Sequence, residues 1–173
     1  MEESHLPQEA RRKSIAVAVL TISDTRTEAD DKSGKIIREK LEDAGHRVQE
    51  HGICLDEGEH IVRQLSDWLL DPAIQAMIFT GGTGIGARDV TVEMVTPYFT
   101  KPLDGFGELF RFLSYTEDVG SKALLSRAAA GTVGEQAVFL LPGSSKAVTL
   151  AMDKLILPEL PHIVHELTKH LEG

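Results

Sequence analysis

Four glycines fall within six residues in the segment 80–86 (TGGTGIG). Glycine adopts backbone conformations that are closed to other residues, and it lets a ligand approach the main chain closely. Exposed N–H groups, together with the hydroxyls of Thr80 and Thr83, can then bind the oxygens of a phosphate. A merely tight strand-to-helix turn would need one glycine rather than four. The segment therefore predicts an anion-binding loop.

Two familiar nucleotide-binding motifs fit this segment poorly. A Walker A loop needs Lys and then Ser or Thr after its last glycine, whereas Gly86 is followed by Ala87 and Arg88. The pattern from Gly82 through Gly84 to Ala87 matches a relaxed dinucleotide-binding fingerprint, but it follows the third predicted strand rather than the first. A nicotinamide-dependent oxidoreductase therefore rests on this weak match alone.

Two aspartates could accompany the glycine segment. Asp89 lies three positions after Gly86, and a carboxylate there would repel a phosphate unless a cation lay between them. Mg²⁺ is typically bound by one or two carboxylates together with substrate phosphates, and Asp56, at the end of another predicted strand, could supply the second carboxylate. Each aspartate also has an ordinary alternative, Asp89 as a helix N-cap and Asp56 as a turn or cap residue.

The other reactive side chains give weaker evidence for a catalytic or binding role. Ser126 lies among small residues where a partner could approach closely, but no G-x-S-x-G elbow supports an acyl-transfer triad. His162 and His165 share a helical face without a third ligand, and the single cysteine, Cys54, cannot make a thiolate zinc site. Ser144, in the segment PGSSK at 142–146, could flank a helix N-terminus and form a second anion site.

Composition restricts the class of protein. A chain of 173 residues predicts one domain, and a net charge of −9 argues against nucleic acid and anionic membranes as partners. No stretch approaches 18 apolar residues, and the first fourteen residues lack the apolar core of a secretory signal. One cysteine excludes a disulfide framework and fits a reducing compartment. We therefore expect a soluble cytoplasmic protein with a small-molecule or protein partner.

Hydrophobic periodicity predicts how these residues are positioned. Residues 1–14 are expected to form a flexible arm and residues 15–173 a single α/β domain. Apolar strands separated by amphipathic helices predict a three-layer αβα domain with a mostly parallel central sheet. The predicted strands are 15–22, 46–55 (leaning to an edge), 75–80 and 136–141, and the predicted helices are 33–44, 58–70, 89–99, 104–114, 121–130, 145–156 and 159–171.

The carboxyl ends of parallel strands open at one edge of a sheet, where α/β proteins bind their ligands. Each of the four predicted strands ends in a polar or glycine-rich segment. We therefore expect these segments to meet at one site, and they are residues 21–24, 55–57, 80–84 and 142–145.

From about residue 15 to the carboxyl-terminal helix, the chain resembles the MoaB/MogA family of molybdenum-cofactor biosynthesis proteins, and it is most similar to the MoaB branch. Seven motifs in order carry the resemblance: Ser23-Asp24-Thr25, Asp31-x-Ser33-Gly34, Thr80-Gly81-Gly82-Thr83-Gly84, Arg88-Asp89-Val90-Thr91, Gly105-Phe106-Gly107-Glu108-x-Phe110-Arg111, Ser126-Arg127-Ala128-x-Ala130-Gly131 and Leu141-Pro142-Gly143-Ser144.

The resemblance implies a molybdopterin-binding fold and an adenylyltransferase. Such an enzyme converts molybdopterin and ATP to adenylylated molybdopterin and pyrophosphate with Mg²⁺, and similar proteins form trimers or hexamers. The family's functional residues fall on Asp56, Asp89 and Ser126 as catalytic groups, with both aspartates also as metal ligands. The expected substrate-binding residues are Ser23, Asp24, Thr80, Gly81, Gly82, Thr83, Gly84, Pro142, Gly143 and Ser144.

Two other readings are open, and the first of them keeps all seven motifs. Adenylylating relatives commonly have proline where this chain has Val92, and Pro-Gly-Asn-Pro where it has Ser144 and Ser145, which are the choices of the MoaB branch. A trimer that binds the pterin or an assembly partner without adenylylating it is therefore the main alternative. A purely structural subunit is another, and it would be favoured if a neighbouring subunit covered the glycine segment.

Overall fold

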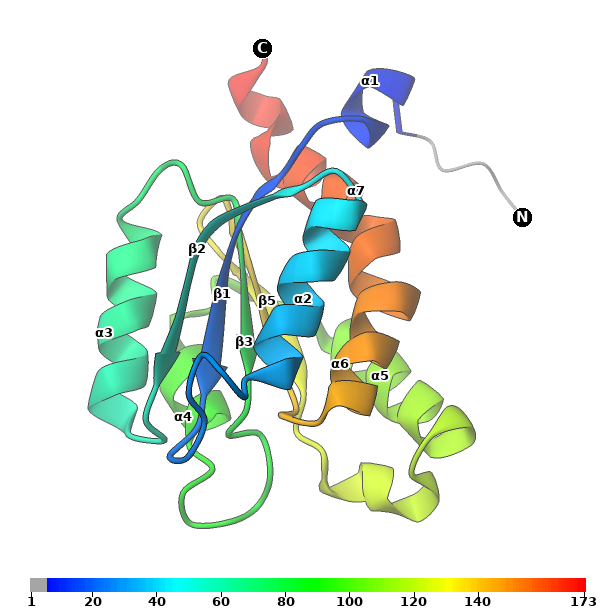
Figure 1. Cartoon of the computed structure of the whole chain (residues 1–173). Helices are drawn as coiled ribbons and strands as arrows, with labels where there is room; N and C mark the ends of the chain where they lie inside the picture. Colours follow the sequence, from blue (N-terminus) through cyan, green and yellow to red (C-terminus); the bar gives the residue numbers. More distant parts are fainter. Residues whose placement is uncertain (1–5) are drawn as a thin grey trace.

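Continuous apolar runs form the centre of the sheet. The computed structural model describes residues 6–173 (Figure 1). Every residue of β1 (Ala16–Ile22) and β3 (Ala76–Thr80) is buried, and so is every residue of β6 (Gln136–Leu141) after its first. This confirms the prediction that these strands are covered on both faces.

The six strands lie in the order β2-β1-β3-β6-β5-β4. The first four are mutually parallel, with β2 (Arg47–Cys54) at the edge as expected, whereas β5 (Ala129–Val133) and β4 (Lys101–Pro102) are antiparallel to their neighbours. The predicted three-layer, mostly parallel α/β architecture is therefore confirmed.

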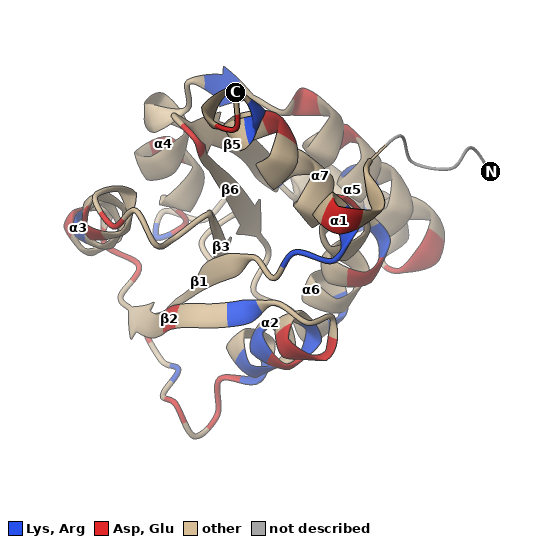
Figure 2. Cartoon of the chain, turned by 90° about the horizontal axis from the view of Figure 1, so that it is seen from above, with Lys and Arg blue, Asp and Glu red and all other residues tan. Residues whose placement is uncertain are grey.

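Helices cover both faces of the sheet (Figures 1 and 2). The alternating side chains of β1 divide the core, because Val17 and Val19 pack in one buried cluster while Ala18 and Leu20 pack in the other. The first cluster is completed by α2 (Lys32–Asp43), α5 (Asp104–Glu117), α6 (Ser145–Ala151), its π-helical continuation η3 (Met152–Ile156) and α7 (Leu157–Thr168). The second is completed by α3 (Gly58–Leu69) and α4 (Thr91–Val95).

The predicted helix at 121–130 is wrong. A 3₁₀ segment, η2 (Gly120–Leu125), is followed by extended chain and then by β5, which pairs antiparallel with β6. Gly131 makes this pairing possible, because a Cβ there would lie 2.4 Å from the ring of Phe99. The helical propensity of three successive alanines is thus outweighed by strand pairing and close packing.

Two other elements differ in extent from the prediction. The short edge strand β4 was not predicted, and the expected helix at 89–99 is divided into α4 and the 3₁₀ turn η1 (Thr96–Tyr98), with Pro97 inside that turn. The end of α2 follows the prediction, since Gly45 adopts a φ of 85° directly after it.

Part of the expected amino-terminal arm is folded. A short helix, α1 (Gln8–Arg11), packs against α7 with Ala10 buried, and Lys13 pairs with Glu172 at 3.0 Å. A 3₁₀ turn, η4 (Lys169–Leu171), follows α7 in this region. Residues 1–5 lie outside the described residues, and the division of the chain at residue 15 stays a prediction.

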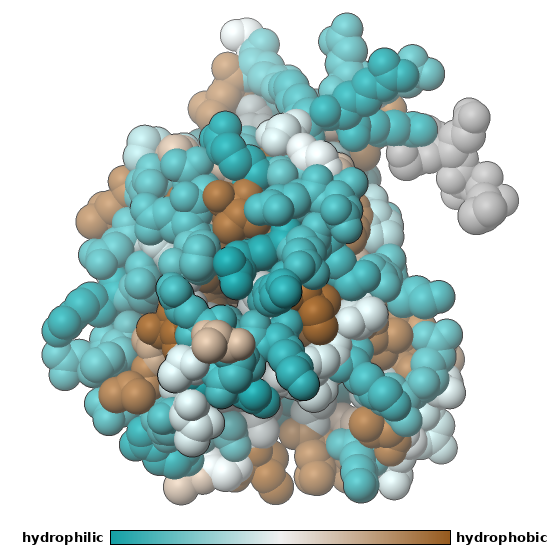
Figure 3. Space-filling model, in the orientation of Figure 1, coloured by the Kyte–Doolittle hydropathy of each residue, from teal (hydrophilic) through white to brown (hydrophobic). Residues whose placement is uncertain are grey.

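The described surface is largely polar. Figure 2 places most charged residues on the helices and loops around a sheet with few charges, and the face in Figure 3 is mostly hydrophilic with scattered apolar side chains. No helix in residues 6–173 is both long enough and apolar enough to cross a membrane.

Candidate functional site

A cavity of about 540 Å³ opens at the carboxyl ends of β1, β3 and β6. Segments far apart in the sequence meet there, as the topology predicts for a parallel sheet. Of the predicted site residues, the cavity is lined by Ser23, Asp56, Thr80, Gly81, Gly82, Thr83, Gly84, Asp89, Ser126, Pro142 and Gly143.

Two predicted residues do not line this cavity. The Asp24 carboxylate accepts two hydrogen bonds from the Arg88 guanidinium, at 3.0 and 2.8 Å, and a third from the N–H of Asp56 at 3.1 Å. Ser144 is the N-cap of α6, where its Oγ accepts a hydrogen bond from the N–H of Ala147 at 3.2 Å. Asp24 therefore helps to position Asp56, and Ser144 has the structural role of a cap; substrate contacts for both stay predictions.

The backbone at the start of the glycine segment requires glycine. Gly81 has a φ of 108° and Gly82 a φ of 69°, a region that other residues rarely adopt. A Cβ on Gly81 would lie 2.1 Å from the carbonyl oxygen of Ile22, at the end of the neighbouring strand. The N–H of Gly81 also donates to the carbonyl of Leu141 at 2.9 Å. The segment is thus held directly against the ends of β1 and β6.

The hydroxyl of Thr80 is already hydrogen-bonded within the protein. Thr80 lines the cavity, but its hydroxyl donates to the carbonyl of Pro142 at 2.8 Å. While that bond is kept, the hydroxyl has no proton to offer a phosphate, and it instead ties two of the loops together. Thr91 has a similar role, because its hydroxyl donates to the carbonyl of Gly81 at 2.9 Å.

Negative charge is concentrated beside the glycine segment. Burial raises the pKa of Asp56, and the negative charges of Asp24 and Asp89 raise it further. Hydrogen bonding to Arg88 lowers the pKa of Asp24, so that its carboxylate stays ionised. Asp89 is not the N-cap of α4, which is Val90; its Oδ2 instead accepts a hydrogen bond from the N–H of Gly86 at 2.9 Å.

A cation would relieve this crowding of charge. Within residues 6–173, no group of three or more His, Cys, Asp and Glu side chains is placed to hold a metal by itself. Asp56 and Asp89 line the cavity, however, and two carboxylates suffice for Mg²⁺ when phosphate oxygens and water complete its coordination. The residues present therefore fit a metal that binds together with a phosphorylated ligand.

Ser126 differs from every other buried polar side chain in residues 6–173. Its Oγ is buried and has no hydrogen-bond partner within the described chain. Leaving such a group unsatisfied typically costs about 1–3 kcal/mol. Because Ser126 also lines the cavity, a ligand atom can supply the missing partner.

Several residues that line the cavity are not among the predicted site residues. Thr21 donates its hydroxyl to the Asp31 carboxylate at 2.8 Å, and Ser33 donates to the carbonyl of Gly143 at 2.7 Å. Ser33 belongs to the motif at 31–34, to which the sequence assigns no role. Thr21 is a polar residue within an apolar strand, and this contrast could have indicated a site residue. The others are Ile22, Thr25, Arg26, Asp31 and Leu125.

We expect Gly81→Ala to lower the free energy of unfolding by roughly 1–3 kcal/mol, because the new Cβ must fit a positive φ. Gly105→Ala in α5 is the matched control: no atom lies within 4 Å of its added Cβ, and alanine favours helix, so stability should stay equal or rise. Chemical denaturation measures both. A Gly81→Ala protein as stable as the wild type would contradict the geometry.

The raised pKa of Asp56 predicts a pH dependence. The folded protein holds this proton more tightly than the unfolded chain, so the contribution of Asp56 to stability falls as pH rises from the ordinary value of 3.8 through the raised pKa. The free energy of unfolding of Asp56→Asn, taken relative to that of the wild type, should therefore be higher at pH 7 than at pH 3. Asp67→Asn, at an exposed position in α3, is the control. A constant difference between Asp56→Asn and wild type across this range would disprove the prediction.

Comparisons with known proteins identify the family of this chain. Residues 18–162 match the family described as "Probable molybdopterin binding domain". Molybdenum cofactor biosynthesis protein B of Staphylococcus carnosus is 54% identical over 159 residues, covering 91% of this chain and 93% of that protein. The Bacillus subtilis protein of the same name is 53% identical over 155 residues, covering 90% and 91%.

Solved structures agree as well. A crystal structure of Molybdenum cofactor biosynthesis protein B has a TM-score of 0.89 and 49% identity, covering 91% of this chain and 98% of that one. The tungsten cofactor synthesizing protein MoaB from Pyrococcus furiosus has a TM-score of 0.80 and 37% identity, covering 90% and 98%. The resemblance carried by the seven motifs is therefore confirmed, and the chain belongs to the molybdenum cofactor biosynthesis protein B (MoaB) family, with a molybdopterin-binding domain.

Proposed function

We propose that this protein adenylylates the terminal phosphate of molybdopterin with Mg²⁺ and ATP and releases pyrophosphate. The observation that supports this best is the composition of one cavity. It combines a glycine segment at the end of a strand, two carboxylates, Asp56 and Asp89, and the unpartnered hydroxyl of Ser126. Phosphoryl-group chemistry requires three kinds of group, and the cavity contains them: a site that binds phosphate, ligands for a divalent cation and a free hydrogen-bond donor.

Each group has a distinct role in the proposal. The backbone around Gly81–Gly84 binds the pterin phosphate, and Ser126 donates its hydroxyl hydrogen to a phosphate oxygen. Asp56 and Asp89 hold Mg²⁺, whose charge would neutralise the phosphates of both substrates and the developing pyrophosphate. The residues Ser23, Pro142 and Gly143 form the remaining walls of the cavity and limit where the substrates can lie.

The proposed reaction is a displacement at phosphorus. An oxygen of the pterin phosphate attacks the α-phosphorus of ATP, a new P–O bond forms, and the bond from the α-phosphorus to the bridging oxygen breaks. The electron pair leaves with pyrophosphate, and no oxidant or reductant is needed. Because the nucleophile is already anionic, the protein need only position the two phosphates and neutralise charge.

The main alternative is that the protein binds molybdopterin without adenylylating it. One observation favours this alternative. The loop at 142–145 is Pro-Gly-Ser-Ser where adenylylating relatives have Pro-Gly-Asn-Pro, and Ser144 caps α6 rather than lining the cavity. Under this reading the same cavity would present the pterin to another enzyme of the pathway.

We propose further that the protein acts in the cytoplasm as a homotrimer or hexamer. Within α5, Phe110 is buried in the core, whereas Phe112 is 62% exposed. Exposed apolar side chains extend along α5 and η2 and would be the contact with a second copy. They are Leu109, Phe112, Tyr115, Leu124 and Leu125.

The adenylylation assay tests the proposal directly. Purified protein with ATP, molybdopterin and Mg²⁺ should form adenylylated molybdopterin and pyrophosphate. Asp56→Asn and Asp89→Asn keep the shape of each side chain but remove its charge, so we expect the rate to fall at least about a hundredfold, as when a charge-stabilising group is lost. Asp67→Asn, on the exposed face of α3, should retain the wild-type rate.

Two other results would decide against the proposal. Saturable molybdopterin binding with no product would establish the non-catalytic alternative. Full activity in both aspartate variants would exclude them as metal ligands.

The assembly has its own test. Leu124→Glu places a charge in the exposed apolar face, whereas Leu70→Glu does so at an equally exposed leucine beyond α3; the two side chains are 85% and 84% exposed. Sedimentation velocity should show a trimer or hexamer for wild type and Leu70→Glu, and smaller species for Leu124→Glu. A monomeric wild-type protein would contradict this assembly.

A further inference from the structure

Arg127 contacts the chain on both sides of the exposed residues 85–88, which include the end of the glycine segment. The Nε of Arg127 donates to the carbonyl of Gly84 at 2.9 Å, and its Nη2 donates to the carbonyl of Asp89 at 3.1 Å. Its own backbone N–H donates to the carbonyl of Thr83 at 3.2 Å. Residues 85–88 between these contacts are exposed, with the side chain of Ile85 70% accessible.

The guanidinium of Arg127 is also held by a carboxylate of α4. It forms an ion pair and two hydrogen bonds with the carboxylate of Glu93 in α4, and this contact lowers the pKa of Glu93. A guanidinium is planar and presents its donors in a rigid fork, so it can contact two carbonyls and a carboxylate at once. The ammonium of lysine is a compact charge and cannot reproduce that arrangement.

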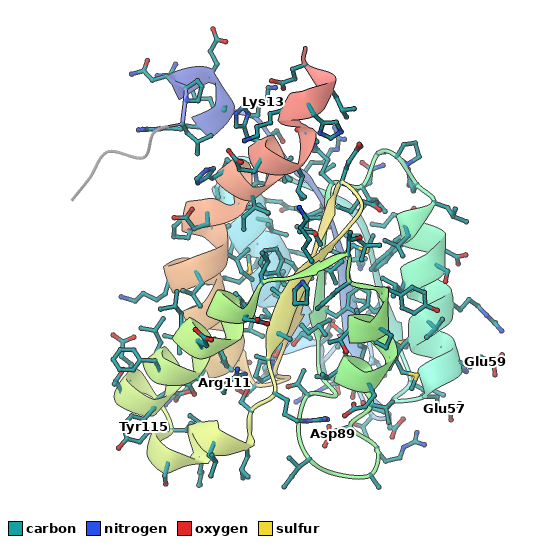
Figure 4. All side chains as sticks on the ribbon, turned by 180° about the vertical axis from the view of Figure 1, so that it is seen from behind. Lys13, Glu57, Glu59, Asp89, Arg111 and Tyr115 are labelled. Carbon is teal, nitrogen blue, oxygen red and sulfur yellow. The ribbon has the colours of Figure 1, made fainter. Side chains whose placement is uncertain are left out.

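A second arginine holds the chain that carries the first. Arg111 of α5 donates to the carbonyl of Ala128 at 2.9 Å and approaches that of Ser126 at 3.5 Å (Figure 4). Gly107, one turn earlier in α5, leaves room for this contact, because its added Cβ would lie 2.8 Å from the carbonyl oxygen of Ala128. The segment 126–128 is therefore braced against α5 on one side and against the glycine segment on the other.

From these contacts we propose that Arg127 is a positioning residue that fixes the glycine segment and Asp89 relative to Ser126. Arg127 binds the backbone carbonyl of Asp89, which lines the cavity, so the position of Asp89 depends on this brace. Ser126 is joined to Arg127 by a single peptide bond, so one side chain couples the hydroxyl of the site to the loop opposite. The catalytic consequence rests on the proposed function, whereas the effect on the loop does not.

An ordinary structural ion pair would behave differently. The Glu93 carboxylate is 48% exposed, and exposed ion pairs usually contribute little to stability. If Arg127 acted only through that pair, Arg127→Lys would keep the pair and behave like the wild type, whereas Arg127→Gln and Glu93→Gln would both lose it and would be equivalent. If the carbonyl contacts matter, only the arginine substitution changes the loop.

The variants for the test are Arg127→Lys and Arg127→Gln, with Glu93→Gln as the matched control that keeps both carbonyl contacts. Hydrogen exchange in the ligand-free protein should be accelerated about tenfold or more at residues 84–89 in both arginine variants, because a charged hydrogen-bonded brace is lost. Exchange in β1 and β3 should be unchanged. Glu93→Gln should match the wild type throughout.

The second measurement is the dependence of adenylylation on the Mg²⁺ concentration. In both arginine variants, the Mg²⁺ concentration that gives half-maximal adenylylation should rise about tenfold, because the ligand Asp89 is no longer held in place. A purely structural role would reduce the folded fraction and leave the Mg²⁺ midpoint of the remainder unchanged. Glu93→Gln should keep the wild-type midpoint.

The two proposals can fail separately. A wild-type protein with no adenylylation would contradict the proposed function, while hydrogen exchange at 84–89 would still decide the role of Arg127. Exchange in Arg127→Lys equal to that of the wild type would overturn the inference, whatever the activity. A Glu93→Gln variant that reproduces the Arg127→Lys result would overturn it too.

Discussion

The site depends on how closely Gly81 passes the end of β1. With a φ of 108° and a virtual Cβ 2.1 Å from the carbonyl oxygen of Ile22, no residue with a side chain fits there without a shift of backbone. That approach lets the chain leave β3 while its N–H still bonds to Leu141 at the end of β6. Three neighbouring strands therefore end in a single hollow, and residues more than a hundred positions apart line one cavity.

Charge is the second constraint. The protein carries a net charge of −9, and Asp31, Asp56 and Asp89 all line the cavity. Arg88 is bound to Asp24 and Arg127 to two carbonyls and Glu93, so these guanidiniums organise the protein rather than face a ligand freely. An anionic ligand would enter such a site most readily together with a divalent cation. Burial raises the pKa of Asp56, and the neighbouring negative charges of Asp24 and Asp89 raise it further.

Local sequence patterns predicted the elements that are buried on both faces. The strands β1, β3 and β6 are largely apolar runs. The glycine segment and Asp89 follow β3, and Asp56 follows the edge strand β2. The resemblance to the family, and not the local pattern, assigned Ser126 a role. Its place in the cavity agrees with that assignment, although the role itself stays a proposal.

The features that escaped prediction depend on contacts between distant segments. The alanines before Gly131 favour a helix, and only the ring of Phe99 and the pairing with β6 make them a strand. The bonds of Arg127 to Gly84 and Asp89 cross about 40 positions in the sequence. No local pattern of residues encodes a bond of that range, whereas apolar periodicity encodes a buried strand directly.

Amide chemical shifts report directly whether molybdopterin binds at the glycine segment. In a titration of the isotopically labelled protein with molybdopterin and Mg²⁺, the backbone N–H signals of Gly81, Gly82 and Gly84 should show the largest changes and saturate together with that of Ser126. Inorganic phosphate should shift a subset of the same signals. Saturable binding that moves signals elsewhere and leaves these four in place would contradict the assignment of this cavity as the pterin site.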